Sequence, residues 1–266
     1  MQKIVLSTFK KYAFQGIAAT GILFACCQTA DATSSVFGAG WTEITNDDGV
    51  QDGGFVDPGW GGQDFDAEYL AYKLVGNTLS IGLQSGFDLI SGKVYSGRNY
   101  YAGDLALSFD DDASIYEYAF DFGKLTRDYQ LDKVDATESN STGMDAYGLW
   151  AVTLWNNDMV PGFVGSSSPF AMDRGTKVSG ANEGTPVLGV DYGYDAVRDT
   201  YWRIVSFDIS AIGSNIKALD LHWTMSCGND AISGHVANVP EPGLFLIFGT
   251  GLVGLIGLQH RKLRKE

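Results

Sequence analysis

The feature that most constrains the fold is the alternation of apolar and polar residues through the middle of the chain. In the segment 78–84, Leu79, Ile81 and Leu83 fall on one face and polar or small residues on the other. This period of two is the pattern of a half-buried β-strand. Similar strand-like runs occur at 69–74, 103–109, 115–122, 147–154, 202–209 and 219–225. The sequence therefore predicts an antiparallel β protein.

Turn signals separate these runs and complete the prediction of the fold. Gly76-Asn77 fits a two-residue hairpin loop, and the residues 110–114 (DDDAS) form an acidic loop between two runs. No run has the period of a long amphipathic helix. Eight to ten strands in about 200 residues indicate one β-sandwich that is jelly-roll-like. The segment 156–186 is poor in strand signal, and is either a functional loop or contains a short additional strand.

The N-terminal segment has the pattern of a signal peptide. Three lysines precede a mostly apolar run at 14–27, and Ala30-Asp31-Ala32 is typical of a signal peptidase site. Cleavage there would make Thr33 the first residue of the mature chain. A lipoprotein signal with Cys26 as the lipidated residue is the alternative.

The cysteines of the mature chain depend on this cleavage. Cleavage after Ala32 leaves Cys227 alone, so no internal disulfide framework is expected. We then expect Cys227 to be a small buried apolar residue. If Cys27 is kept, a bridge between Cys27 and Cys227 becomes an alternative.

The C-terminal segment has three parts in a fixed order. The motif Pro240-Glu241-Pro242 precedes an apolar, Gly-rich run at 243–258, and a basic cluster follows: Arg261, Lys262, Arg264 and Lys265. As a helix, the run would be about 24 Å long, slightly short of a bilayer core of about 30 Å. The basic cluster is expected on the cytoplasmic side. A plain membrane anchor explains the helix and the charges, but not the Pro-Glu-Pro.

This tail resembles the PEP-CTERM sorting domain. The resemblance implies a Gram-negative host, transient anchoring in the inner membrane, and an exosortase that cuts near Pro240–Pro242. It also implies release or transfer to the cell surface, commonly in bacteria that make exopolysaccharide. The expected layout is a signal peptide at 1–32, a β-sandwich ectodomain at 33–239 and the sorting signal at 240–266.

The acidic charge of the chain lies almost entirely between the two terminal segments. Seven of the 18 basic residues are in those segments, whereas nearly all of the 32 acidic residues lie between them. The middle is therefore more acidic than the whole-chain net charge of −14. Such a domain repels nucleic acid and anionic membranes, and suits divalent cations or neutral partners. The alternative is that the acids only keep an exported protein soluble.

Signatures of an enzyme are scarce. The sequence holds no HExxH, GxSxG or P-loop pattern, and we expect no catalytic residues. A pair of carboxylates for glycoside cleavage needs no sequence signature, so a polysaccharide-active enzyme is the weakest alternative. His222 is expected on the exposed face of a strand, and His235 in a linker ahead of the Pro-Glu-Pro.

Acidic residues and glycines crowd the region before the first strong strand. Calcium binds six to eight oxygen ligands from flexible loops, although the spacing here is not that of an EF-hand. The candidate calcium ligands are Asp47, Asp48, Asp52, Asp64, Asp66 and Glu68. A solvated acidic loop without calcium is the alternative, and no other cofactor is expected.

Several pieces of the middle resemble exosortase-dependent surface proteins, among them Gly61-Gly62-Gln63, Gly103-Asp104-Leu105 and Trp223-Thr224-Met225. Their order is also similar to family 9-type carbohydrate-binding sandwiches. The resemblance implies a non-catalytic surface or matrix protein associated with exopolysaccharide, with a carbohydrate-binding module as the alternative. The aromatic residues that could stack on sugar rings, or pack in the core, are Trp41, Trp60, Tyr100, Tyr101, Trp150 and Trp155.

Overall fold

The structure is a computed structural model that describes residues 35–47, 61–124, 146–157, 167–213 and 216–237. The chain divides into two compact units, Met1–Asp31 and Ala32–Glu266, and every described residue belongs to the second. The predicted domain boundaries at Thr33 and Val239 lie outside the described residues. The predicted signal peptidase site, the Pro-Glu-Pro and the basic cluster lie outside them as well.

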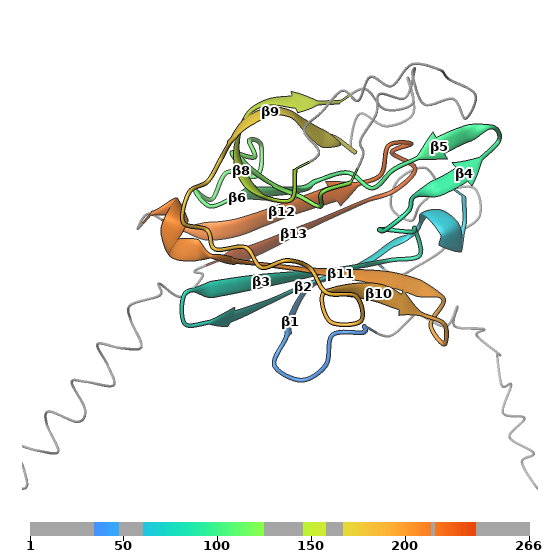
Figure 1. The fold of residues 1–266 in the computed structure, drawn as a ribbon, viewed down its shortest axis with the longest axis horizontal. Coiled ribbons are helices and arrows are strands. Elements are labelled where there is room, and N and C mark those ends of the chain that lie inside the picture. Colours follow the sequence, from blue (N-terminus) through green and yellow to red (C-terminus); the bar gives the residue numbers. More distant parts are fainter. Residues whose placement is uncertain (1–34, 48–60, 125–145, 158–166, 214–215, 238–266) are drawn as a thin grey trace, which may run out of the picture. The chain divides into compact units, whose positions relative to one another are not determined.

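Two antiparallel sheets form the two layers of a sandwich (Figure 1). The five-stranded sheet has the spatial order β1 (Thr42–Asn46), β2 (Ala67–Val75), β3 (Thr78–Ser85), β11 (Thr200–Asp208), β10 (Tyr192–Asp195). The six-stranded sheet has the order β13 (Ala231–Ala237), β12 (Ala218–Thr224), β6 (Leu105–Ser108), β7 (Tyr118–Asp121), β8 (Gly148–Asn156), β9 (Ala171–Lys177). The predicted all-β antiparallel sandwich is confirmed.

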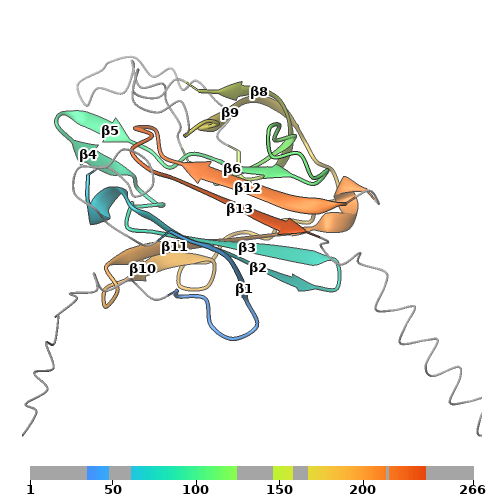
Figure 2. The ribbon, with the colours of Figure 1, turned by 180° about the vertical axis from the view of Figure 1, so that it is seen from behind.

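The chain crosses between the layers three times. Strands β1 to β3 lie in the five-stranded sheet, β6 to β9 in the six-stranded sheet, and β10 and β11 in the first sheet again. The last two strands, β12 and β13, return to the six-stranded sheet, as Figure 2 shows from behind. A separate hairpin is formed by β4 (Lys93–Tyr95) and β5 (Arg98–Tyr100). The only helical elements within the described ranges are two 3-10 turns, η1 (Gln63–Phe65) and η3 (Ile209–Ile212).

The main core lies between the sheets and uses the residues that the alternation placed on one face. Leu79, Ile81 and Leu83 of β3 are at most 1% exposed. They share one apolar cluster with Phe207 of β11 and Trp223 of β12. Burial of each such side chain contributes about 1.5 to 3 kcal/mol before the entropic cost of ordering it. The apolar faces that the alternation predicts are therefore buried where one sheet packs on the other.

The predicted Gly76-Asn77 hairpin is confirmed, since β2 ends at Val75 and β3 begins at Thr78. Gly76 has a φ of 60°, and no positive φ is found at Asn77. Glycine at the first central position of a two-residue loop is the requirement of a type II′ turn. That turn fixes the register in which Val75 pairs with Thr78.

The number and bounds of the strands differ from the prediction. The described residues form thirteen strands rather than eight to ten. Strand β9 lies inside the segment 156–186, which therefore contains the additional strand that the sequence left open. Strand β7 begins only at Tyr118, and Ile115 is 60% exposed in the loop before it.

No helix in the part of the chain that the structure describes is long and apolar enough to cross a membrane. The predicted transmembrane run at 243–258 lies outside that part.

Candidate functional site

The outer face of the six-stranded sheet carries a buried polar row. Asp220, His222 and Thr224 of β12 point away from the core, as the alternation predicts, but each is at most 3% exposed. The prediction that His222 lies on the exposed face of a strand is therefore wrong. The reason is that residues from loops cover this face: the ring of Tyr116 lies over His222 with 5.8 Å between centroids, and the carbonyl oxygen of Ser167 lies 3.1 Å from His222 Nε2.

Strand register brings His235 next to Asp220. Residue His235 of β13 pairs with Asp220 of β12, which in turn pairs with Ser108 of β6. In antiparallel pairs, directly opposite side chains lie about 5 Å apart on the same face. The prediction that His235 lies in a linker is wrong, because the strand β13 extends to Ala237. The hairpin of β12 and β13 is thus what creates this pair.

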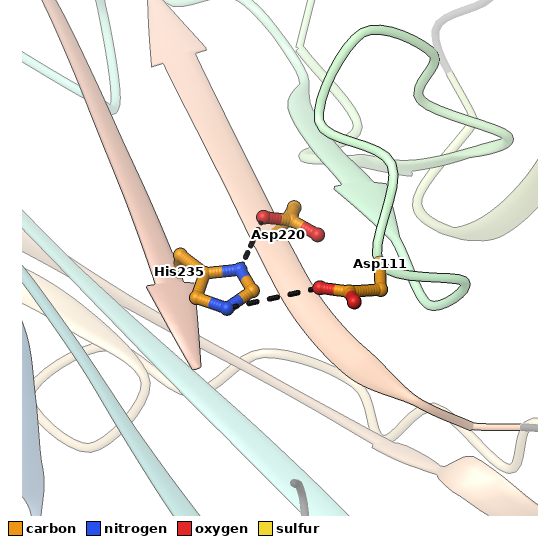
Figure 3. A group of neighbouring side chains, drawn as sticks. All are labelled: Asp111, Asp220 and His235. Atoms are coloured by element: carbon orange, nitrogen blue, oxygen red, sulfur yellow. Dashed lines mark hydrogen bonds and ion pairs between the residues drawn. The ribbon is translucent and has the colours of Figure 1, made fainter. Parts of the chain in front are cut away.

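Three side chains converge at this point: Asp220 from β12, His235 from β13 and Asp111 from the loop between β6 and β7 (Figure 3). The Nδ1 atom of His235 lies 2.7 Å from Asp220 Oδ1. A carboxylate can only accept, so Nδ1 carries the hydrogen and donates it. On the other side of the ring, Nε2 lies 3.9 Å from Asp111 Oδ1. One ligand atom from each residue lies within 4.8 Å of the others.

Asp220 is a buried carboxylate with an incomplete set of partners. Its side chain is 3% exposed, and its Oδ2 atom is buried without a hydrogen-bond partner. Among the described residues, no lysine or arginine lies within 4.0 Å of it, and His235 is its only ion-pair partner. Burying a charged oxygen without a donor or cation is costly. A cation near Oδ2 would therefore stabilise the buried carboxylate of Asp220.

The surroundings of His235 favour the charged form of its ring. The hydrogen bond to Asp220 raises the pKa of His235, as do the negative charges of Asp220 and Asp111, while slight desolvation opposes them. The ring is half exposed, so water and small ions reach it. The arrangement can hold a cation at Nε2, either a proton or a metal ion.

The loop that carries Asp111 is held by its own side chains. Asp110 accepts a hydrogen bond from the backbone N–H of Asp112. Asp112 accepts from the backbone N–H and the hydroxyl of Ser114, which lowers the pKa of Asp112. Asp111, between these turns, has a φ of 72°, a conformation that aspartate and asparagine tolerate better than most residues.

His222 forms a separate and closed arrangement beside this cluster. Its Nε2 lies 3.1 Å from the carbonyl oxygen of Ser167, which can only accept, so Nε2 donates. Nδ1 then accepts from the hydroxyl of Ser233 at 2.8 Å. Burial lowers the pKa of His222, and the ring of Tyr116 covers it with 5.8 Å between centroids. Both ring nitrogens are used, so His222 links β12 to β13 and to the loop at Ser167, and neither nitrogen is free for a ligand.

A small pocket opens next to the same loop. It has a volume of about 200 Å³ and is lined by Phe109, Asp110, Glu117, Tyr118 and Ile212. Burial raises the pKa of Glu117, and the charge of Asp110 adds to this effect. Two carboxyl groups in one pocket are the minimum for glycoside cleavage. The pocket, however, is below the range of about 300 to 1,000 Å³ that small-molecule sites occupy.

The predicted calcium ligands do not form one group in the described part of the chain. Asp64 makes an ion pair with Lys93 at 2.6 Å, while Glu68 is fully buried and accepts hydrogen bonds from Gln63 and Gln84. Asp66 is 1% exposed, and Asp47 is half-buried ahead of the segment that is not described. Asp48 and Asp52 lie outside the described residues. Calcium at this segment stays a prediction.

The aromatic candidates for sugar stacking are at least partly buried where the structure describes them. Tyr100 and Trp150 are each 9% exposed. Trp150 donates its indole N–H to the carbonyl of Ala146. Trp155 donates its indole N–H to the carbonyl of Tyr116. The other candidates are Trp41 and Tyr101, which are half-buried, and Trp60, which lies outside the described residues.

The lone cysteine of the described residues is buried, as the sequence predicted. Cys227 is 3% exposed and unpaired. Burial raises the pKa of its thiol to about 12. A thiol of that pKa is not a nucleophile near neutral pH, so Cys227 acts as a packing residue.

Sequence reasoning found the acidic loop but not the cluster. The sequence predicts a loop at residues 110–114, but nothing in it joins Asp111 to His235. A signal was available in the run 231–237 (AISGHVA), where Ile232 and Val236 alternate with Ser233 and His235. Gly234 interrupts this alternation, because it offers no side chain at the central apolar position.

Comparison with known proteins gives one match. The model of the PEP-CTERM protein-sorting motif matches residues 238–262. No curated protein and no solved structure matches the chain. The resemblance of the tail is therefore confirmed, and the match begins at the residue after β13 ends.

Proposed function

Because the PEP-CTERM motif indicates an exported protein that an exosortase sorts, we propose that the protein is a non-catalytic component of the cell surface or extracellular matrix. The observation that carries this proposal is the position of the motif at 238–262, directly after the last strand of the sandwich. An exosortase that cuts within the motif would leave every described strand intact. The folded domain is then the part that reaches the cell surface, and the tail is the sorting signal that directs it there.

The processing steps follow from the order of the parts. Signal peptidase would release the N-terminus after Ala32, and the apolar run at 243–258 would hold the chain in the inner membrane for a time. The exosortase would then cut near Pro240–Pro242. The acidic ectodomain would leave the membrane for the cell surface or the medium.

Mass spectrometry of the surface-associated protein tests the sorting. We expect an N-terminus at Thr33 and a C-terminus near Pro240–Pro242. The variant Pro240→Ala/Pro242→Ala should accumulate with its tail in the membrane, whereas the control Glu43→Gln, an exposed acid of β1, should be processed normally. Surface protein with an intact tail through Glu266 would contradict the proposal.

The proposal also includes a more specific point, that the exported domain associates with exopolysaccharide. The acidic domain suits neutral polysaccharide or divalent cations, and disfavours nucleic acid. The pocket of about 200 Å³ beside Asp110 and Glu117 is small for a sugar chain, so we do not place the polysaccharide there. Surface retention should fall in a host strain that makes no exopolysaccharide. Equal retention in both strains would contradict the association.

A carbohydrate-binding module is the second candidate, and one surface favours it. On the outer face of the five-stranded sheet, the half-buried indole of Trp202 packs against the backbone of Gly193. The contact favours glycine, because a side-chain Cβ at position 193 would lie only 3.0 Å from the indole ring. Phe37 lies on Gly82 in the same way and contacts Trp41, with 5.1 Å between ring centroids. Flat aromatic rings on a sheet are a surface on which sugar rings stack.

A glycan array separates the two candidates. Binding of a defined neutral glycan, lost in Trp202→Ala and kept in Trp155→Phe on the other sheet, would support the module. No binding to any glycan would favour a matrix component without its own sugar site. Turnover of the host polysaccharide, abolished by Glu117→Gln, would overturn both in favour of an enzyme.

A further inference from the structure

We propose that His235 and Asp111, supported by Asp220, bind a divalent transition-metal ion such as Zn²⁺. The site lies where the last strand of the sandwich meets the acidic loop between β6 and β7 (Figure 3). It uses none of the residues of the sorting motif. Its presence or absence therefore leaves the proposed sorting untouched.

The hydrogen bond to Asp220 prepares the ring of His235 for a metal. Nδ1 donates to Asp220 Oδ1 at 2.7 Å, so in the neutral ring the lone pair is on Nε2. That lone pair faces Asp111 Oδ1, another acceptor, at 3.9 Å. In the neutral ring both atoms are acceptors, so the contact becomes favourable only with a cation between them, either a proton or a metal ion. Zn²⁺ binds nitrogen and carboxylate oxygen at about 2.1 Å, so one ion spans up to about 4.2 Å between two ligands.

Asp220 provides an independent observation in favour of a ligand. Its side chain is 97% buried, its Oδ2 has no hydrogen-bond partner, and Figure 3 draws that oxygen on the side of Asp111. A histidine ligand whose other ring N–H is donated to a carboxylate is a recurrent arrangement at metal sites. The ion, or a water molecule bound to it, would supply the positive charge or the donor that Oδ2 lacks.

The ligand types select the class of metal. Imidazole nitrogen suits zinc, copper, nickel and iron, whereas calcium and magnesium prefer all-oxygen sets. One imidazole and one or two carboxylates leave coordination positions for water. The side chains of Asp111 and His235 are 62% and 49% exposed, so ion and water enter directly from solvent.

The ion would join two elements that are distant in the sequence. Asp111 belongs to the β6–β7 loop and His235 to β13, two residues before the strand ends at Ala237. The sorting motif begins at the next residue. A bound ion would thus fix the end of the folded domain next to the segment that the exosortase recognises.

Two substitutions remove the ligands with little effect on the fold. Asp111→Asn keeps a residue that tolerates the φ of 72° but removes the charge. His235→Asn keeps an N–H for Asp220 but removes Nε2. Glu43→Gln, on the other sheet, is the control for loss of one exposed charge.

The test is calorimetric titration of the metal-free full chain, purified in detergent, with Zn²⁺, and with Co²⁺ followed by visible absorption. We expect one Zn²⁺ per chain at the site, with affinity at least about tenfold weaker in Asp111→Asn and His235→Asn and unchanged in Glu43→Gln. Cys26, Cys27 and His260 also offer ligands, so the difference between variants is the readout. Equal zinc and cobalt binding in all four proteins, or binding by none, would overturn the proposal.

Discussion

Glu68 and Asp220 are both buried carboxylates on strands of opposite sheets, but their surroundings differ. The carboxylate of Glu68 accepts from Gln63 Nε2 at 2.7 Å and from Gln84 Nε2 at 2.6 Å. The hydroxyl of Thr200 lies 2.7 Å from its Oε2. Asp220 has the half-exposed ring of His235 on one oxygen and no hydrogen-bond partner on the other.

This difference separates a structural acid from a binding acid. Neutral donors that surround a carboxylate compensate its desolvation and fix the strands that carry them. Glu68 is of this kind, because its donors come from η1, β3 and β11. Asp220 differs, because one of its oxygens has no hydrogen-bond partner and a solvent-accessible histidine lies beside it. Such a carboxylate can still bind a cation. Substitution at each position should therefore have different consequences.

The largest effect is expected from Glu68→Ala. The substitution removes the acceptor of the buried Gln84 amide, whereas the hydroxyl of Thr200 can still donate to the carbonyl of Ser85 at 3.0 Å. An unmet buried donor costs about 1 to 3 kcal/mol, so we expect the free energy of unfolding to fall by about 2 kcal/mol. Chemical denaturation of the full chain measures it. Glu68→Gln, which keeps one acceptor oxygen, should cost less, and a loss below about 1 kcal/mol in Glu68→Ala would contradict the structural role.

The role of Glu68 shows what spacing in a sequence can predict. The sequence predicts Glu68 only as a candidate calcium ligand, because acids and glycines crowd around it. Its partners Gln84 and Thr200 are 16 and 132 residues away, and only the pairing of β2 with β3 and of β3 with β11 brings them together. Local alternation predicted those strands, but not their order in the sheet.

A smaller effect is expected from Asp220→Asn in metal-free protein. The amide oxygen can still accept from His235 Nδ1, and the atom that replaces Oδ2 was without a partner before the change. We expect the free energy of unfolding to change by about 1 kcal/mol. The measurement is the same denaturation, made with chelator present. A loss as large as that of Glu68→Ala would show that Asp220 is a structural acid as well.

Only part of the cluster around Asp220 could be predicted from the sequence. The alternation in 219–225 placed Asp220 opposite Leu219 and Leu221 correctly. The burial of that second face could not be read from it, because the covering residues, such as Tyr116 and Ser167, come from loops. His235 was missed since Gly234 breaks the pattern of β13. The sorting motif, by contrast, is read from contiguous residues and needs no fold to be recognised.

Glu117, in the loop just before β7, is a third acid that can be compared with Glu68 and Asp220, and it is only partly buried. Its Oε2 has no hydrogen-bond partner. Burial raises its pKa above the ordinary value, and the charge of Asp110 raises it further, although hydrogen bonds from its own backbone N–H and from Ser108 oppose the shift. The folded protein therefore favours the protonated form of Glu117, and the charged form destabilises the fold at neutral pH.

Glu117→Gln should for this reason stabilise the protein, by less than about 1 kcal/mol because solvent screens a half-exposed group. The sign of the pH dependence follows from the raised pKa. At about pH 3, well below the ordinary glutamate pKa of about 4.3, the carboxyl group is protonated in folded and unfolded chains, and the variant and the wild type should be equally stable. As the pH rises from the ordinary pKa through the raised pKa of the folded protein, the wild type loses stability relative to the variant. Denaturation at about pH 3 and pH 7, with Glu43→Gln as the exposed control, measures this difference. A variant less stable than the wild type at pH 7 would mean that the charge of Glu117 is compensated, as that of Glu68 is.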